Sequence, residues 1–339
     1  MSRTITRTIM RTWMIILLIV AVTSGCGSKA QFSEDKINVL TSFYPLYDLA
    51  RKIGGDHVQV INMIPAGVDP HDWSPKSQDL VNLTKGQLFV YNGAGFDDWW
   101  VEDMLASINS GKKPHVVKAS EGLTLISVSD TDSVEEESST DDHDHEHDHS
   151  SDGHAIGDGH DHDHGDYDPH TWLSLLNAIT MAGNIKDGLI AVDPDNRADY
   201  EANYEKLRSE LMQLHEQFAQ MVERGARREF VTSHRAFAYL ARDYGLTQLS
   251  VMGLSTEAEP TSQAIKEISD FIRDHGVRYL LLEELASPKL AETLARDLGI
   301  GILTLNPIEG LTKEQEASGE DYLSLMRHNL SSLELALQE

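Results

Sequence analysis

The feature that most constrains the fold is a long helical pattern near the middle of the chain. Asp193-Pro194-Asp195 offers a capping carboxylate followed by a proline, as at many helix starts. From there to about Arg224 the sequence contains no glycine or proline. Apolar side chains recur at three- and four-residue steps, at Leu207, Leu211, Leu214, Phe218, Met221 and Val222. The pattern predicts a stiff helix roughly 45 Å long that connects two halves of the chain.

Strand-like and helical patterns alternate on both sides of this helix. Before it, the strand-like runs are 37–41, 58–64, 88–91 and 115–118, and the helical ones are 44–53, 76–85 and 96–108. After it, the strand-like runs are 229–232, 247–251, 278–282 and 300–305, and the helical ones are 237–244, 261–274, 288–298 and 322–337. Such alternation predicts parallel sheets covered by helices. We therefore expect an α/β protein of two lobes with parallel sheets, joined by one long rigid helix.

The N-terminus has the pattern of a targeting segment. Arg3, Arg7 and Arg11 precede an apolar run, Trp13 to Val22, that is short for a membrane span. Thr23-Ser24-Gly25-Cys26 follows and contains the only cysteine, so no disulfide is possible within the chain. These residues resemble the lipobox of bacterial lipoproteins, in which the cysteine is lipidated, although Thr23 replaces the usual aliphatic residue. A plain signal peptide is the alternative.

These patterns give an expected division of the chain. We expect a signal peptide at 1–25, a lipid-anchored tether at 26–36, an N-terminal α/β lobe at 37–192 with a loop at 129–166, a linking helix at 193–225 and a C-terminal α/β lobe at 226–339.

Half of the histidines fall in one acidic segment of the N-terminal half. Imidazoles alternate with Asp, Glu, Gly and Ser at His143, His145, His147, His149, His154, His160, His162 and His164. With almost no apolar residues, the segment is expected to be a loop that is disordered or ordered by metal. Neutral imidazole together with carboxylate suits divalent transition metals, zinc above all. A solvated acidic linker is the alternative interpretation.

The net charge of -27 argues against some partners. No Lys or Arg occurs between Lys118 and Lys186, where acidic residues are dense. Such a field attracts cations and repels polyanions, so we expect no nucleic-acid partner. The sequence also lacks the Gly-x-x-x-x-Gly-Lys-Ser/Thr loop that binds nucleotide phosphates.

Three further histidines share a local setting. His71 and His170 each stand in Asp-Pro-His, and His234 stands in Thr-Ser-His-Arg-Ala-Phe. Each follows a predicted strand or loop and precedes a helical pattern. Ligands of open parallel sheets gather beyond the carboxyl ends of the strands, so these three side chains could converge. Asp69 and Asp168 are candidates to support the histidines, although Asp before Pro is also ordinary turn chemistry.

Four motifs together carry a family resemblance. The runs Pro-Ala-Gly-Val-Asp-Pro-His-Asp-Trp-Ser-Pro, Asp-Pro-His-Thr-Trp-Leu, Ser-His-Arg-Ala-Phe-Ala-Tyr-Leu-Ala and Leu-Asn-Pro-Ile-Glu-Gly-Leu occur in order. They resemble the zinc-specific substrate-binding lipoproteins of bacterial ABC transporters, over essentially the whole mature chain. The resemblance implies one metal held between two α/β lobes by three histidines and one carboxylate.

The resemblance implies specific ligands. They are His71, His170, His234 and Glu309. Manganese-type relatives carry Glu and Asp at the last two positions, so this chain resembles the zinc type. From the residues alone, Glu283 and Glu284 at a predicted strand end compete with Glu309 for the fourth position. Three imidazoles and one carboxylate suit a closed tetrahedral zinc site.

The expected function is therefore that of an extracytoplasmic zinc receptor. It would hand Zn²⁺ to an ABC permease and, through it, its ATPase, as a monomer anchored to the bacterial membrane by Cys26. The alternatives are a manganese or iron receptor of the same class, and an added role as an adhesin. An enzyme is not expected, because the chain has no His-Glu-x-x-His helix and the ligand set leaves no open metal position.

Other conspicuous residues are assigned structural or surface positions. Trp99 and Trp100 are expected to cover the core or the lobe surface. Five histidines are expected on the surface or on helix faces: His57, His115, His215, His275 and His328.

Overall fold

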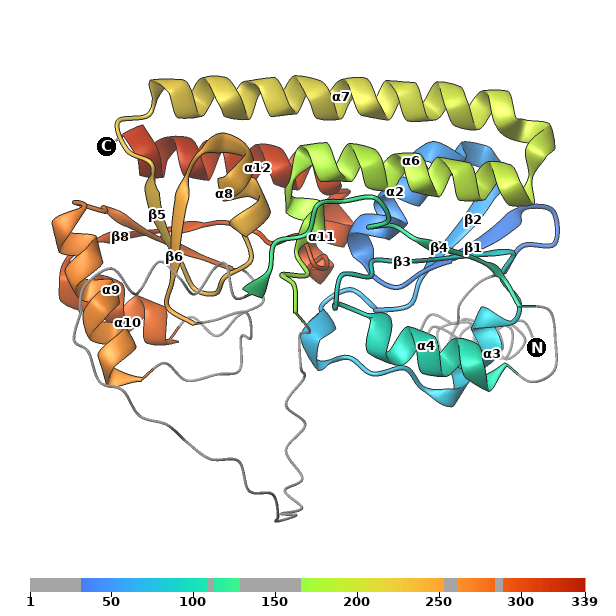
Figure 1. Cartoon of the computed structure of the whole chain (residues 1–339), viewed down its shortest axis with the longest axis horizontal. Helices are drawn as coiled ribbons and strands as arrows, with labels where there is room; N and C mark the ends of the chain where they lie inside the picture. Colours follow the sequence, from blue (N-terminus) through green and yellow to red (C-terminus); the bar gives the residue numbers. More distant parts are fainter. Residues whose placement is uncertain (1–31, 109–112, 129–165, 253–260, 284–288, 339) are drawn as a thin grey trace, which may run out of the picture. The chain divides into compact units, whose positions relative to one another are not determined.

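The computed structural model describes residues 32–108, 113–128, 166–252, 261–283 and 289–338. Residues 35–339 form one compact unit, and the fold below is that of this unit. It contains two four-stranded parallel sheets, one on each side of the chain's long helix (Figure 1). The predicted class, two α/β lobes with parallel sheets joined by one long helix, is confirmed.

The N-terminal sheet has the strand order β2-β1-β3-β4. Its strands are β1 (Ile37–Thr41), β2 (Val58–Asn62), β3 (Leu88–Tyr91) and β4 (His115–Lys118). The connecting helices are α2 (Tyr44–Gly54), α3 (Ser77–Leu83) and α4 (Asp98–Ser107), with short 3-10 turns η1 (Gly55–His57) and η2 (Pro70–Asp72). Each strand lies at its predicted position. The strand β2 and the helix α4 are shorter than expected by two or three residues.

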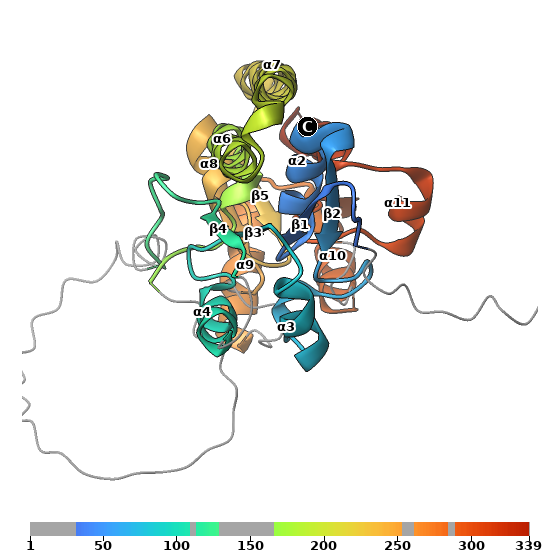
Figure 2. The same ribbon diagram turned by 90° about the vertical axis from the view of Figure 1, so that its right-hand side faces the viewer.

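A helix that the sequence analysis did not assign covers this sheet. The 3-10 turn η4 (Thr171–Leu173) leads into α6 (Leu175–Val192), where the Ser174 hydroxyl accepts the first-turn N–H of Asn177. Apolar residues surround most of α6, so no helical stripe stands out in its sequence. It packs between α7 and the sheet (Figure 2). Gly188 allows the approach, because a Cβ there would lie 2.5 Å from a methyl group of Val117.

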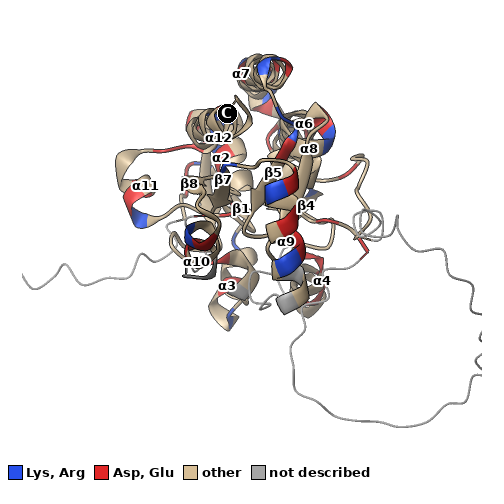
Figure 3. Cartoon of the chain, turned by 90° about the vertical axis from the view of Figure 1, so that its left-hand side faces the viewer, with Lys and Arg blue, Asp and Glu red and all other residues tan. Residues whose placement is uncertain are grey.

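The long helix begins where the sequence predicts. Pro194–Asn196 form the 3-10 turn η5, and α7 runs from Arg197 to Arg224. Its buried residues are Tyr200 and the six apolar positions that define the sequence pattern. It lies along α6, α2 and α12 (Figure 1). Lys, Arg, Asp and Glu are mixed along α7 and α9, as Figure 3 shows.

The C-terminal sheet repeats the arrangement of the first, with the order β6-β5-β7-β8. Its strands are β5 (Glu229–Thr232), β6 (Thr247–Ser250), β7 (Tyr279–Leu282) and β8 (Gly301–Thr304). The helices are α8 (Ala238–Tyr244), α9 (Ser262–Asp274), α10 (Lys289–Leu298), α11 (Lys313–Ser318) and α12 (Tyr322–Gln338). The sequence analysis missed α11, although Thr312 and Gln315 form a capping box there.

Two apolar clusters make up the core. The larger one joins α2, α6, α7, α8 and α12 and includes residues from both sheets, such as Val39 and Phe230. The smaller one lies within the C-terminal lobe, between its sheet and the helices α9 and α10. Across the described ranges, every helix is too short or too polar to cross a lipid bilayer. The shared core fixes the carboxyl ends of the two sheets relative to each other.

Candidate metal centre

His71 is presented by the short turn η2 in the N-terminal lobe. The Asp69 carboxylate accepts the backbone N–H of His71 at 2.9 Å, and Pro70 occupies the first position of the turn. The ring of Phe96 stands nearly edge-on to the imidazole, with centroids 5.7 Å apart. The Asp-Pro-His sequence therefore builds a local turn that directs the imidazole away from the sheet.

His170 follows a second Asp-Pro-His sequence in the same lobe and is fully buried. One oxygen of Asp168 accepts both the backbone N–H of His170 and its Nδ1–H, each at 2.9 Å. The Asn92 amide, at the carboxyl end of β3, donates to the carbonyl of Pro169 at 3.0 Å. Because Nδ1 donates to a carboxylate, the lone pair of Nε2 is directed towards the opposite side.

His234 follows β5 in the C-terminal lobe and is also fully buried. Its Nδ1–H donates to Glu283, at the end of the neighbouring strand β7. The same oxygen of Glu283 accepts the hydroxyl of Ser233 and, at 3.2 Å, the backbone N–H of His234. The orientation of this imidazole is therefore fixed by a residue that is distant in sequence.

Glu309 stands on the loop between β8 and α11. The preceding Ile308 is buried and has a φ of 57°, which is unusual for a β-branched residue. Its N–H donates to the Asn306 side chain at 2.7 Å, and Asn306 is in turn bonded to Asn329 of α12. These bonds hold the strained backbone from which the Glu309 carboxylate projects.

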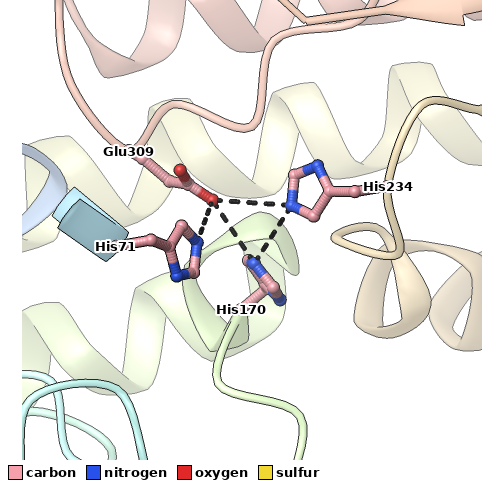
Figure 4. Close-up of side chains that lie close together, drawn as sticks. All are labelled: His71, His170, His234 and Glu309. Atoms are coloured by element: carbon pink, nitrogen blue, oxygen red, sulfur yellow. Dashed lines mark hydrogen bonds and ion pairs between the residues drawn. The ribbon is translucent and has the colours of Figure 1, made fainter. Parts of the chain in front are cut away.

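The four side chains converge on one point (Figure 4). One ligand atom from each lies within 4.8 Å of all the others. The Glu309 Oε1 is 3.4, 3.3 and 3.8 Å from the Nε2 atoms of His71, His170 and His234. The two buried Nε2 atoms are 3.4 Å apart. Four ligands about 2.0–2.1 Å from a single zinc ion at tetrahedral corners are about 3.3–3.4 Å apart, so the cluster has nearly the dimensions of such a site.

The electrostatics of the cluster favour a bound cation. Burial disfavours the charged form of Glu309, but the three imidazoles outweigh this and hold its pKa well below its usual value. Burial also lowers the pKa of His170, yet Asp168 and Glu309 raise it overall to about 10. The pKa of His71 is raised as well, because the charge and hydrogen bond of Glu309 exceed the cost of burial. The carboxylate is thus ionised, and protons occupy positions that a metal ion would take.

Comparison with known proteins identifies the family. Residues 39–336 match the family model described as ZnuA, zinc-uptake complex component A, periplasmic. The chain belongs to the ZnuA family. It is 35% identical over 322 residues to the high-affinity zinc uptake system protein ZnuA of Bacillus subtilis, with 94% of both chains covered.

Other ZnuA relatives are longer than this chain. The zinc-binding protein AdcA of Streptococcus pyogenes is 34% identical over 308 residues, covering 91% of this chain and 57% of AdcA. This chain thus spans little more than half of such relatives. The crystal structure of the Zn(II)-bound ZnuA-like domain of Streptococcus pneumoniae AdcA is 30% identical with a TM-score of 0.71, covering 90% of this chain and all of that one. The laminin-binding protein of Streptococcus agalactiae, described as an adhesin with metal-transporting activity, is 30% identical with a TM-score of 0.72, covering 89% of this chain and 99% of that one.

The ZnuA fold brings all four expected ligand residues together. Glu309 points its carboxylate at the three Nε2 atoms, whereas the competing Glu283 lies behind His234 on the Nδ1 side. Glu284 lies outside the described residues, as do Cys26 and the eight histidines from His143 to His164. The sequence analysis missed the role of Glu283 as a support of His234. Its position at a strand end was the available signal.

The remaining conspicuous residues lie away from the cluster. Trp100 is buried, and Trp99 is 48% exposed. The five histidines assigned to the surface are partly or fully exposed, which confirms that expectation. His57 pairs with Asp199 at 2.8 Å, and His215 contacts the Tyr244 hydroxyl at 3.0 Å.

Proposed function

We propose that this protein is an extracytoplasmic zinc receptor that binds one Zn²⁺ through His71, His170, His234 and Glu309 and delivers it to an ABC permease. The observation that supports this most is the convergence of three Nε2 atoms and one carboxylate oxygen within 4.8 Å in a buried site. Family membership and the zinc-binding names of the relatives agree with it. Zinc is here the cargo, which the protein binds and releases unchanged.

The ligand chemistry favours zinc over manganese. Three imidazole nitrogens and one carboxylate form a tetrahedral N3O set, which is common for zinc. Manganese prefers more oxygen ligands and a higher coordination number. The carboxylates of Asp168 and Glu283 face the Nδ1 atoms, so they are turned away from the point where the four ligand atoms meet.

The same geometry supports capture rather than catalysis. Zinc enzymes keep a coordination position open for water or substrate. Four protein ligands would complete a tetrahedral shell here. The three histidines and Glu309 are each at least nine-tenths buried, which leaves little room for a reacting molecule.

The deciding experiment is a metal titration of the mature protein. Zinc and manganese are titrated in competition with a chelator, first with the wild type and then with His234→Ala. We expect one tight site that prefers zinc and is lost in the variant. A wild-type preference for manganese would overturn the proposed cargo and leave the manganese or iron receptor in its place.

The proposal extends to residues that the structure does not describe. We infer that Cys26 carries the lipid anchor and that the histidines of 143–164 collect zinc for the buried site. Deletion of 141–165 is expected to remove weak zinc sites and keep the tight one. Replacement of Cys26 by Ser is expected to release the protein from the membrane fraction of expressing cells. Retention of the variant in that fraction would contradict the lipid anchor.

The permease and its ATPase are proposed as partners on family grounds, with the receptor acting as a monomer. Zinc-dependent growth at low zinc concentration, in a strain lacking the gene, tests delivery. Complementation by the wild type and not by His170→Ala is the expected result. An added adhesin role rests on the laminin-binding relative alone and is tested by binding of the purified protein to immobilised laminin.

A further inference from the structure

Trp172 stands two residues after His170 at the junction of the two lobes. Its side chain is fully buried. The indole ring packs against Phe43 and Phe96 of the N-terminal lobe, with centroids 4.7 and 5.2 Å away, and against the His170 imidazole at 5.3 Å. The ring is therefore fixed in place by the same lobe that presents His170.

The polar groups of Trp172 are bonded to the opposite lobe. Its indole N–H donates to the carbonyl of Pro307 at 2.7 Å, two residues before Glu309. Its own carbonyl accepts the hydroxyl of Tyr322, at the start of α12, at 2.5 Å. Burial raises the pKa of the Tyr322 hydroxyl, so it remains a donor at any physiological pH. Two hydrogen bonds thus connect Trp172 with the C-terminal lobe.

The loop that carries Glu309 is restrained at three successive residues. Asn306 is bonded to Asn329, and the N–H of Ile308 is bonded to Asn306, all within the C-terminal lobe. The bond to Pro307 lies between these two and comes from the N-terminal lobe. The backbone of Ile308, with φ at 57°, is a conformation that only surrounding contacts can maintain.

We propose that Trp172 is a positioning residue for the metal site, whose indole N–H holds the Glu309 loop at a fixed separation from the His170 segment. The inference rests on the proposed function, because it assumes that both residues bind the same ion. The aromatic contacts fix the ring, the ring fixes the Pro307 carbonyl, and that carbonyl fixes the backbone before Glu309. A shift of this loop would lengthen the Glu309 to His170 separation, which is 3.3 Å.

The test is Trp172→Phe, which keeps an aromatic ring and removes the N–H. Loss of a buried hydrogen bond is expected to weaken zinc binding about 5- to 30-fold in a chelator competition assay, mainly through faster dissociation. Cobalt(II) loaded in place of zinc reports the ligand geometry directly. We expect its visible absorption bands to shift and weaken in the variant.

A matched control separates positioning from general loss of packing. Trp100→Phe makes the same replacement at another buried tryptophan, packed against Trp73 and Phe89. Its zinc affinity and cobalt spectrum should stay within about twofold and unshifted, because no ligand loop depends on its N–H. Thermal unfolding of both metal-free variants records the purely structural cost.

The outcomes are distinct. Trp172→Phe with lowered thermal stability, but with wild-type zinc affinity and cobalt spectrum, overturns the positioning role. If that variant does not fold, Tyr322→Phe removes the reciprocal bond and is expected to weaken zinc binding in the same direction. An unchanged affinity and spectrum there also overturn the inference. If the wild type prefers manganese, the proposed cargo fails, and the same affinity comparison with Mn²⁺ decides the role of Trp172.

Discussion

The segments around His170 and His234 solve one problem in two ways. Both imidazoles are fully buried, and both donate Nδ1–H to a carboxylate, so that Nε2 faces the common point. Asp168 supports His170 from two residues earlier in the N-terminal lobe. Glu283 supports His234 from the next strand of the C-terminal sheet, 49 residues away.

The difference shows which support can be seen in a sequence. Asp-Pro-His is a local motif, because the carboxylate and the imidazole share one turn. The pairing of His234 with Glu283 requires that β5 lie beside β7, which depends on the order of strands. The two carboxylates also differ in their bonding. Glu283 accepts three donors, whereas among the described residues one oxygen of Asp168 is buried without a donor.

The largest expected effect comes from removing either imidazole. His170→Ala and His234→Ala should each weaken zinc binding by about 100-fold or more, since one of four ligands is lost from a site worth about 10–16 kcal/mol in comparable proteins. Chelator competition measures both. Equal losses support the equivalence of the two segments, and tight binding by either variant would contradict the ligand assignment.

A smaller effect is expected from the two supporting carboxylates. Glu283→Gln and Asp168→Asn should each weaken zinc binding about 10- to 100-fold, because an unsupported imidazole loses both orientation and basicity. The loss should be larger for Glu283→Gln, which disturbs three donors. Isothermal titration of both variants checks the order. A larger loss for Asp168→Asn would show that the local turn, and not the bond to Nδ1, dominates.

The pH dependence separates the segments further. The raised pKa of His170, about 10, means that zinc must displace a proton at neutral pH. Apparent zinc affinity should therefore fall as the pH is lowered from 9 to 6. Titrations in buffers of different ionisation enthalpy measure the proton released. Asp168→Asn removes one cause of the raised pKa and should make the slope shallower, whereas an unchanged slope would assign the proton elsewhere.

The same group affects the metal-free protein. A histidine whose pKa is higher in the folded than in the unfolded state stabilises the fold fully below its unfolded pKa, about 6.5. That contribution is lost as the pH rises through the folded pKa of about 10. The melting temperature of the metal-free protein should decline across this window, as followed by circular dichroism. The decline should be smaller in His170→Ala, and an equal decline in both proteins would refute the assignment.

The smallest effect is expected at Ser233. Its hydroxyl donates to Glu283, which already holds two other donors. Ser233→Ala should weaken zinc binding only about two- to fivefold, the range of one neutral hydrogen bond. Direct titration is sensitive enough to detect this change. A loss as large as that of Glu283→Gln would mean that the hydroxyl, rather than the carboxylate charge, sets the orientation of His234.

Much of the fold is visible in the sequence because its period is visible. Each strand and the long helix α7 follow apolar patterns that survive in the structure. The helix α6 was missed because it is buried on several sides and interrupted by Gly183 and Gly188. The turn around His71 is local and was readable. The strained Ile308 and the bond from Trp172 to Pro307 arise from contacts between lobes, which no local pattern encodes.

The two apolar clusters determine how the molecule comes apart. The larger one includes α7 and residues of both sheets, so the lobes share a core and neither could retain its structure after the other had melted. The smaller one holds α9 and α10 against the outer C-terminal sheet. Amide hydrogens there are expected to exchange with solvent sooner than those of α7. Opening would thus begin at the periphery of one lobe while the four converging side chains stayed together.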